Sequence, residues 1–581
     1  MNNNDGSPSQ KGRRDLLKIG AAATASTALP AQLGFTSVVA KDLPPGPTTP
    51  PFLVPLPMPS IKVAESALFP APTTLANLAN GEAGREAHQG LAHWPVKKYY
   101  NLRVKEGMHS YHPYVPTQKI WGYDGTVPGP TFIAYHGEPA MVRIHNELPQ
   151  STIGHGSPEI STHLHNAHCG SESDGFAGNY YSKWKKGPTL GAAGGYKDHH
   201  YPNCYANYDR YDATDGDPRE GMGTLWYHDH RMDFTAGNVY RGLAGFYLMF
   251  DHIDTGNERD TRDTALRLPS GVGVHDIPLA LTDMLFDSSG NIMYDQFENK
   301  GHMGNRFCVN GKIQPFFKVQ PRKYRFRFLD ASLARYYELY IVRGTENLEY
   351  DHIANDGNLL PAPLKTKKFQ LAPAERGDIV FDFAPYAGWK LYLVNRLIMK
   401  DGRGPDDATV NVRDASGNLV HPGVQLMRFD VAFSSTPVED PSRVPPVLRA
   451  LAPINLTEVT KTRKFRFDKV NDVWTVNGKI FDPEVATAKV KRGATEIWEL
   501  EGNGSWHHPV HIHMTEGRIL SRNGKAPPPH ERARKDVYSV ASGEVVRVLL
   551  RFSDFTGKYI MHCHNLTHED HSMMIRFDVE A

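Results

Sequence analysis

Four pairs of histidines, each separated by one residue, are the positions where the chain most strongly indicates chemistry. They are His163/His165, His228/His230, His511/His513 and His562/His564. With 28 histidines in 581 residues, roughly one such pair is expected by chance. On a β-strand, residues i and i+2 point to the same face, so each pair predicts two imidazoles side by side. Eight imidazoles exceed the needs of a structural zinc site, so the sequence predicts a cluster of several metal ions.

A second metal site is predicted around Cys563, on the opposite side of the same strand. In the tripeptide 562–564 the cysteine points away from its two flanking histidines. His508 lies an odd number of residues before the next histidine pair, so it can face away from that pair as well. His568 and Met573 follow Cys563 closely along the chain. Two histidines, one cysteine and a weakly bound methionine are the ligand set of a blue-copper electron-transfer centre.

The elements that must position these residues are predicted to be short strands. Residues 131–135 and 141–144 flank a turn, residues 243–250 form a continuous apolar run typical of a strand buried on both faces, and residues 324–328 and 545–550 alternate. The sequence contains no convincing long amphipathic helix. We therefore expect an all-β protein built from Greek-key β-sandwich domains.

Three such domains are predicted, because one hydrophobic core does not extend over a chain of this length. Charged or Ser/Pro-rich breaks near residues 254–263 and 434–446 give domains at 41–255, 262–435 and 445–581. The first and third domains each carry two histidine pairs, which indicates an internal duplication. The formal net charge of +1, from 65 basic and 64 acidic residues, gives no reason to expect nucleic acid or an anionic membrane as a partner.

The N-terminus is interpreted as a twin-arginine signal peptide over residues 1–40. Arg13 and Arg14 precede a weakly apolar, Ala-rich stretch from Ile19 to Leu29, and Ala40 ends a small-residue cleavage site. That stretch is too short for a membrane anchor, and no other segment could span a bilayer. These features predict export in the folded state by the twin-arginine machinery, to the periplasm or the exterior.

Only four cysteines occur, so the chain is not a disulfide scaffold. Cys169 and Cys204 lie in one polar stretch, and whether they form a disulfide after export is left open. Cys308 precedes an Asn-Gly turn and is expected to be a small buried apolar group.

The histidine motifs, together with several other segments, resemble those of the multicopper oxidases. The copper motifs are residues 226–230, 508–513 and 562–573. Further stretches resemble the bacterial laccase branch that includes the spore-coat laccase, with bilirubin oxidase and phenoxazinone synthase as relatives; these are residues 121–125, 128–131, 320–327 and 371–376. The resemblance runs from about residue 95 to the C-terminus. It implies cupredoxin-like domains and four copper ions, one of type 1, one of type 2 and two of type 3.

The resemblance also implies the ligands of each copper. The type 1 ion would be bound by His508, Cys563, His568 and axial Met573. The type 2 ion would be bound by His163 and His511. The type 3 pair would be bound by His165, His228, His230, His513, His562 and His564. The histidines expected at the surface or behind the ligands include His168, His199, His200, His507 and His571.

The implied reaction is a laccase-like oxidation of small molecules by dioxygen. A phenolic, aromatic or tetrapyrrole donor would give single electrons near His508 or His568, and Cys563 would pass them to the histidine cluster, where dioxygen is reduced to water. Glu569 and Asp174 are the expected proton donors, although Asp174 in Asp-Gly is equally expected as a turn residue. The alternatives are a Cu(I) or Mn(II) oxidase and an exported, non-enzymatic cupredoxin protein.

Two features depart from that resemblance. Asn166 stands where relatives have glycine, and because asparagine tolerates left-handed backbone we expect the turn to be kept. The segment 176–225 is longer than expected and rich in Gly, Tyr, Lys and His. Its role is left open by the sequence.

Overall fold

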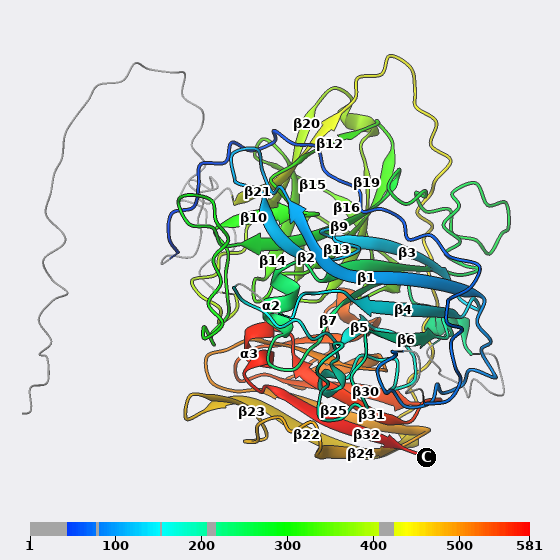
Figure 1. Cartoon of the computed structure of the whole chain (residues 1–581). Helices are drawn as coiled ribbons and strands as arrows, with labels where there is room; N and C mark the ends of the chain where they lie inside the picture. The colour runs from blue at the N-terminus through cyan, green and yellow to red at the C-terminus, as the bar shows by residue number, and fades with distance from the viewer. Residues whose placement is uncertain (1–42, 77–80, 151–153, 206–215, 406–422) are drawn as a thin grey trace, which may run out of the picture. The chain divides into compact units, whose positions relative to one another are not determined.

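The computed structural model describes residues 43–76, 81–150, 154–205, 216–405 and 423–581 (Figure 1). The predicted signal peptide lies outside these ranges. Within them the chain forms six β-sheets, which follow one another along the chain in three pairs.

The first pair of sheets is formed by residues 98–250. One sheet has the order β2-β1-β4-β6 and the other β3-β8-β7-β5. The strands are β1 (Lys98–His109), β2 (Gln118–Tyr123), β3 (Gly129–Tyr135), β4 (Ala140–Asn146), β5 (Thr162–His165), β6 (Tyr196–Tyr201), β7 (Thr224–Asp229) and β8 (Ala244–Phe250). The apolar core between them includes Leu102, Val142 and Phe132. Strand β8 is buried over most of its length, as its apolar run predicted.

The second pair is formed by residues 276–431, with strand orders β11-β10-β9-β13-β19-β16-β17 and β12-β21-β20-β14-β15, and with β18 paired to β14. The strands are β9 (Asp276–Met284), β10 (Arg306–Val309), β11 (Lys312–Ile313), β12 (Phe316–Val319), β13 (Lys323–Asp330), β14 (Tyr337–Arg343), β15 (Glu346–Leu348), β16 (Tyr350–Asn355), β17 (Asn358–Thr366), β18 (Phe369–Leu371), β19 (Arg376–Asp382), β20 (Lys390–Asn395) and β21 (Val424–Val431).

Strand β13 has an alternating sequence, which usually indicates one buried and one exposed face, but both of its faces are buried. Its arginines are as buried as its aromatic residues, because each one meets a carboxylate. Arg325 binds Asp254 and Asp378, both at 2.7 Å, and Arg327 binds Asp276 at 2.7 Å. The polar face of this strand therefore packs into the protein interior through ion pairs.

The third pair is formed by residues 459–580, with orders β23-β22-β25-β30-β27-β28 and β24-β32-β31-β26-β29. The strands are β22 (Val459–Val470), β23 (Val473–Val476), β24 (Ala486–Lys491), β25 (Ala494–Gly502), β26 (His508–Ile512), β27 (Gly517–Arg522), β28 (Arg534–Lys535), β29 (Val537–Val540), β30 (Val545–Phe552), β31 (Gly557–Cys563) and β32 (Met574–Glu580). Strand β30 alternates cleanly between buried and half-buried positions.

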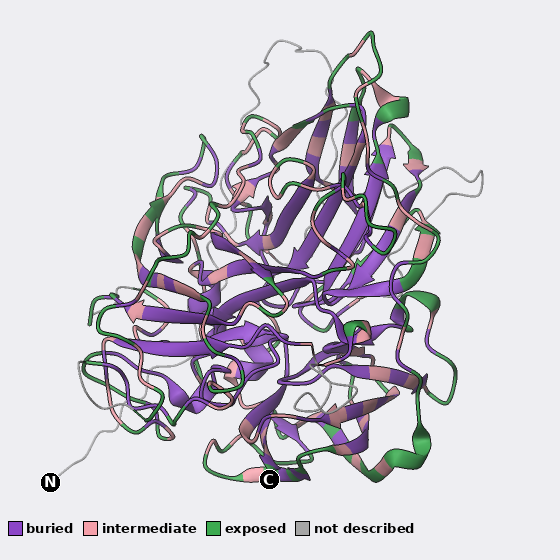
Figure 2. Ribbon diagram, turned by 90° about the vertical axis from the view of Figure 1, so that its right-hand side faces the viewer, coloured by how far each residue is buried: buried purple, intermediate pink, exposed green. Residues whose placement is uncertain are grey.

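Helices are few and short in the described ranges. Two of them, α2 (Thr235–Tyr240) and α3 (Leu566–Asp570), are joined by a hydrogen bond from the Ala236 N–H to Asp570 Oδ2 at 3.0 Å. The buried positions follow the strands through the interior (Figure 2). The predicted all-β fold is confirmed, and the described strands fall within the three predicted domain ranges, whose boundaries themselves stay a prediction.

Candidate metal centres

Strand pairing brings the four histidine pairs into register two by two. Strand β5 pairs with β7 so that His163 lies opposite His228, and β26 pairs with β31 so that His511 lies opposite His562. The second member of each pair follows two residues later on the same face. Each pair of strands therefore presents four imidazoles on one face.

The two groups of imidazoles face each other across the first and third pairs of sheets. The Nε2 atoms of His163 and His511 are 3.4 Å apart, and those of His230 and His562 are 3.2 Å apart. The ring centroids of His165 and His511 are 3.7 Å apart. All eight imidazoles are buried. We call these eight residues the histidine cluster.

Several outer nitrogens of the cluster are held by hydrogen bonds, which turn the inner nitrogens of the same rings toward the interior of the cluster. The Nδ1 atom of His163 donates to the Asp174 main-chain oxygen at 2.5 Å, and that of His511 donates to the Asp536 main-chain oxygen at 2.9 Å. Such outer bonds fix the tautomer of a metal-binding histidine and orient its ring. The Nε2 lone pairs are thereby left for a metal ion.

Burial is the main cause that lowers the pKa of His228 and His230, and the neighbouring histidines act in the same direction, whereas Glu569 opposes. The pKa of His228 falls to about 3 and that of His230 to about 4. Neutral imidazole is the form that binds metals. The Nε2 atom of His228 and both ring nitrogens of His564 are buried and make no hydrogen bond to the described residues. Unsatisfied buried nitrogens in this number fit a site that binds metal ions.

Carboxylates lie directly behind the cluster at the positions predicted for proton donors. Glu569 Oε2 is 2.8 Å from His562 Nδ1, and its Oε1 is 3.2 Å from His230 Nδ1. Asp174 Oδ2 is 2.8 Å from His513 Nδ1. Each carboxylate is buried and touches the cluster through an outer nitrogen.

Cys563 lies on the opposite side of β31, at a second group of ligands. Its Sγ atom is 3.5 Å from Nδ1 of both His508 and His568. Met573 is buried in the same core, and its N–H donates to the His568 main-chain oxygen at 3.0 Å. The indole of Trp474 lies over His568 with ring centroids 3.8 Å apart. This group is enclosed, and the sequence did not predict Trp474.

Asp536 and Arg376 are also at the site, and sequence reasoning missed them. Asp536 Oδ2 is 3.2 Å from His165 Nε2. The Arg376 guanidinium donates two hydrogen bonds to the same carboxylate, at 2.9 and 3.0 Å. Arg376 ends the segment 371–376 that carries the family resemblance, which was the available signal. Asp536 stands in no recognised motif.

The histidines that were expected at the surface or behind the ligands differ in how deeply they are buried. His168, His199 and His200 are buried, whereas His507 and His571 are half-buried. His168 donates to Asp554 Oδ2 at 2.7 Å and is a structural group.

Known proteins resemble the chain over most of its length. Sequence signatures of the multicopper oxidase family match residues 100–184 and 452–581. The chain is 35% identical over 543 residues to bilirubin oxidase of Albifimbria verrucaria, covering 92% of this chain and 82% of that protein. It is 32% identical to the laccase of Bacillus subtilis, covering 83% and 94%.

The chain belongs to the multicopper oxidase family. Solved structures agree with its fold: a laccase from Pediococcus acidilactici has a TM-score of 0.68 at 23% identity, covering 93% of this chain and 98% of that chain. McoA from Aquifex aeolicus has a TM-score of 0.65 at 25% identity, covering 84% and 97%. The domains of this multicopper oxidase are cupredoxin-like, as predicted.

This multicopper oxidase is a laccase-like oxidoreductase that uses dioxygen as electron acceptor and a separate electron donor. Its family uses four copper ions, one of type 1, one of type 2 and two of type 3. The buried histidines of the cluster, together with His508, Cys563, His568 and Met573, fit that complement. Bound copper supplies one-electron redox chemistry at both centres.

The turn at Asn166 and the cysteines outside the metal centres were also subjects of the sequence predictions. Asn166 has φ of 73°, in the left-handed region, as expected for a residue in place of glycine. All four cysteines are buried free thiols, so Cys169 and Cys204 form no disulfide here. Cys308 is buried in an apolar cluster before the Asn310-Gly311 turn, as predicted.

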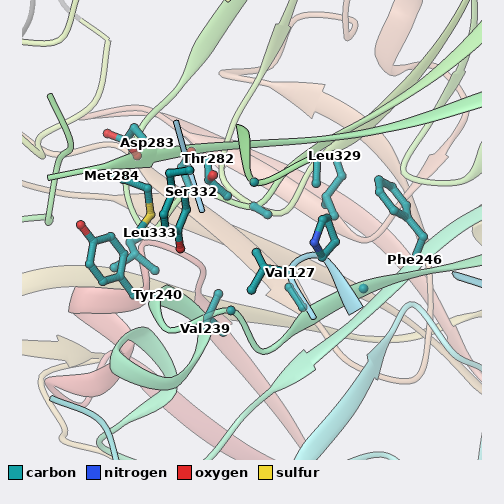
Figure 3. A pocket seen from close by; sticks show the side chains of 18 residues that line it. Val127, Val239, Tyr240, Phe246, Thr282, Asp283, Met284, Leu329, Ser332 and Leu333 are labelled. Carbon is teal, nitrogen blue, oxygen red and sulfur yellow. The ribbon is translucent and has the colours of Figure 1, made fainter. Parts of the chain in front are cut away.

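An apolar cavity lies apart from the copper ligands, between α2, β8 and β9. It has a volume of about 40 Å³, and Val127, Tyr240, Phe246, Met284 and Leu333 are among the residues that line it (Figure 3). No histidine or cysteine is part of its lining. It is therefore not a further metal site.

Proposed function

We propose that this multicopper oxidase takes electrons from bulky aromatic donors, either phenols or tetrapyrroles, at a cleft beside His568. The observation that carries the proposal is the contact between that histidine and the cleft wall. His568 Nε2 donates to the Lys300 main-chain oxygen at 3.0 Å. Lys300 lines an open cleft of about 850 Å³. A donor bound there is separated from His568 by one layer of backbone.

The lining of the cleft is suited to aromatic molecules. Tyr294, Phe297 and His302 contribute rings, and Phe297 is 88% exposed. Aromatic groups gain about 0.5–1.5 kcal/mol from pairing with such rings, in addition to their buried area. The bilirubin oxidase relative supports a tetrapyrrole as one candidate donor.

The roles of the ligands form part of the same proposal. The Cys563 group, His508, Cys563, His568 and Met573, would hold the type 1 ion. His163 and His511 would hold the type 2 ion. The type 3 pair would be held by His165, His228, His230, His513, His562 and His564. Cys563 lies between His562 and His564 in the chain, so its side chain and backbone give a direct covalent route from the type 1 site to the cluster.

Glu569 and Asp174 would hold and deliver protons for the reduction of dioxygen. Asp174 Oδ2 accepts from His513 Nδ1 at 2.8 Å, and Glu569 Oε2 lies 2.8 Å from His562 Nδ1. A carboxyl group one hydrogen bond behind a ligand is close enough to supply protons without entering the metal site.

Export by the twin-arginine machinery is part of the same proposal and rests on the N-terminal sequence. The twin-arginine motif at Arg13 and Arg14 would direct the folded, copper-loaded protein to the periplasm or the exterior, with the twin-arginine machinery as partner. Among the described residues, no helix is long and apolar enough to cross a membrane.

A second candidate function is oxidation of a metal ion, Cu(I) or Mn(II). Met293 and Met303 line the same cleft as His302. Thioether and imidazole groups are ligands that Cu(I) accepts. The cleft therefore offers soft ligands as well as aromatic rings.

One assay separates these candidates. The copper-loaded protein is given a phenol, bilirubin, Cu(I) or Mn(II), and oxygen uptake is recorded. We expect uptake with the aromatic donors, and a raised KM for bilirubin in Phe297→Ala but not in Phe433→Ala, whose ring is exposed elsewhere. Uptake with Cu(I) alone would establish the metal oxidase, and no uptake with any donor would refute both candidates.

A further inference from the structure

A second group of buried titratable side chains lies beside the histidine cluster and has no part in binding copper. It is built on β6 and on the loops that precede β1 and follow β5. Its members are His88, Glu172, Lys197, His199 and His200, and each is at most 8% exposed. Strand β6 belongs to segment 176–225, whose role the sequence left open.

The inner end of this group is fixed to the loop that carries Asp174. His199 Nδ1 donates to the Ser173 main-chain oxygen at 2.9 Å, and the His200 N–H donates to Ser173 Oγ at 2.9 Å. Asp174 itself holds His513 of the histidine cluster. The group therefore begins one residue from a carboxylate that touches the metal site.

The outer end reaches toward the surface through Glu172. His88 Nδ1 is 3.5 Å from Glu172 Oε1, and Gln89 donates to both carboxylate oxygens, from its N–H at 3.2 Å and from Nε2 at 3.1 Å. Gln89 is half-buried, and the neighbouring Ala87 is exposed. Glu172 therefore lies one layer below the protein surface.

Between these ends, several polar atoms are buried without a hydrogen-bond partner among the described residues. They are His88 Nε2, Lys197 Nζ, His199 Nε2 and His200 Nδ1. Buried polar atoms are satisfied by protein or by ordered water in nearly all folded proteins. All four atoms belong to residues of this group, and ordered water bound to them would provide a route along which protons pass.

We propose that Lys197 and Glu172 form the outer part of a proton path from the surface at Gln89 to the histidine cluster. The proposal rests on the dioxygen-reducing function of the protein. In each step the Lys197 ammonium releases one proton inward, and the neutral amine takes up one proton from the Glu172 side. Four passages supply the four protons that accompany four electrons in the reduction of dioxygen to two waters.

The charges around Lys197 suit this exchange. Burial is the main cause that lowers the pKa of Lys197 to about 8, with Arg85 and Lys558 acting in the same direction and Glu172 and Asp174 opposing. Proton carriers work best when their pKa lies near the working pH. The buried His199 beside Lys197 has its pKa lowered well below the usual value, by burial and by the Lys197 charge, so it stays neutral.

A purely electrostatic role for Lys197, as a fixed counter-charge to the two carboxylates, makes a different prediction. Arginine keeps the positive charge but does not release its proton in proteins. Lys197→Arg therefore separates charge from proton transfer, and Lys197→Met removes both. Glu172→Gln and Glu172→Asp make the same separation for the carboxylate.

The experiment uses the copper-loaded, fully reduced protein mixed with dioxygen. The return of the blue absorbance and the uptake of protons, followed with a pH dye, are recorded from pH 6 to pH 9, a range chosen to span the pKa of about 8 of Lys197. We expect Lys197→Met, Lys197→Arg and Glu172→Gln to be slower by about tenfold or more, with unchanged copper content. The decline of the parent rate above pH 8 should disappear in both Lys197 variants, and Glu172→Asp should recover most of the rate.

The matched control is Glu147→Gln, an exposed carboxylate of the same domain paired with Arg103, which should behave as the parent. A parent rate and pH profile in Lys197→Arg would overturn the path and leave only a charge effect. If Lys197→Met does not fold, parent-like proton uptake in Glu172→Gln would overturn it equally. A parent protein that is not reoxidised would refute the oxidase function itself, whereas normal parent turnover with unaffected variants would refute the path alone.

Discussion

The Arg376 guanidinium and the Asp536 carboxylate form a buried, two-pronged ion pair with N···O distances of 2.9 and 3.0 Å. The pair joins all three sheet pairs, because Arg376 begins β19, Asp536 precedes β29, and Arg376 Nε donates to the Thr224 main-chain oxygen on β7 at 3.1 Å. Since Asp536 also lies 3.2 Å from His165 Nε2, the interface and the metal site share one carboxylate.

Replacing Arg376 with methionine should destabilise the protein and weaken copper binding together. The change leaves Asp536 buried without its cation, and removing one partner of a buried pair costs about 3–5 kcal/mol. We expect a lower apparent Tm and a copper content below four ions per chain, measured by thermal scanning and metal analysis.

The control is Arg343→Met, which removes an exposed pair with Glu346. Exposed pairs contribute about 0–1 kcal/mol, so its Tm should stay close to that of the parent. Full copper loading and an unchanged Tm in Arg376→Met would show that the pair does not support the site.

Glu569→Gln should slow dioxygen reduction and leave the blue centre intact. The substitution keeps the size of the side chain between His230 and His562 but removes the group that can hold a proton. Loss of a general acid costs about a hundredfold in rate. Blue absorbance and oxygen uptake are measured on the same sample, and equal turnover in both proteins would refute the relay role of Glu569.

Cys563→Ser should abolish the blue absorbance and the oxidation of donors. Serine lacks the thiolate that faces Nδ1 of His508 and His568 at 3.5 Å. The histidine cluster lies on the opposite face of β31, so its copper should remain detectable by electron paramagnetic resonance. Met573→Leu is the milder companion, expected to stay blue with a changed reduction potential, because the axial ligand tunes that potential. A blue Cys563→Ser protein would disprove the assignment.

His352 should make the protein less stable in acid. It is 3% exposed on β16, and burial, with the His530 charge, lowers its pKa from 6.5 to about 4. In the unfolded chain His352 takes up a proton near pH 6.5, whereas in the folded protein it takes up a proton only near pH 4. Stability is therefore fully present above pH 6.5 and falls as the pH decreases toward 4, by about 3 kcal/mol in total.

The measurement compares the apparent Tm of the parent with that of His352→Gln between pH 4 and pH 7, a range that spans the ordinary histidine pKa of 6.5 and the pKa of about 4 of His352 in the folded protein. Glutamine has no proton to take up in this range, so the variant should lose less Tm on acidification. Parallel curves for the two proteins would show that His352 does not contribute to the acid sensitivity.

Much of the copper chemistry was predictable because strand geometry is local. Two residues along a strand return to the same face, so each His-x-His pair had to present its imidazoles together, and Cys563 had to face the other way. The left-handed backbone at Asn166 was predictable for the same reason, since asparagine tolerates that conformation on its own.

The sequence was less informative where burial depends on what packs against a residue. The alternation of β13 is typical of a half-exposed strand, yet Arg325 and Arg327 are buried because carboxylates from other segments reach them. Lys197 and His199 likewise belong to a polar segment that gave no sign of being buried.

The sequence by itself determined which side chains share a face of a strand, and therefore which metals the chain can bind. Only the tertiary structure decided which faces meet. His163 and His511 lie 348 positions apart, and their Nε2 atoms come within 3.4 Å because two separate sandwiches pack against each other. The positions of Asp536, Arg376 and the Lys197–Glu172 group result from the same packing. Contacts between distant segments depend on how whole sheets fit together, so they produce no recognisable spacing of residues in the sequence.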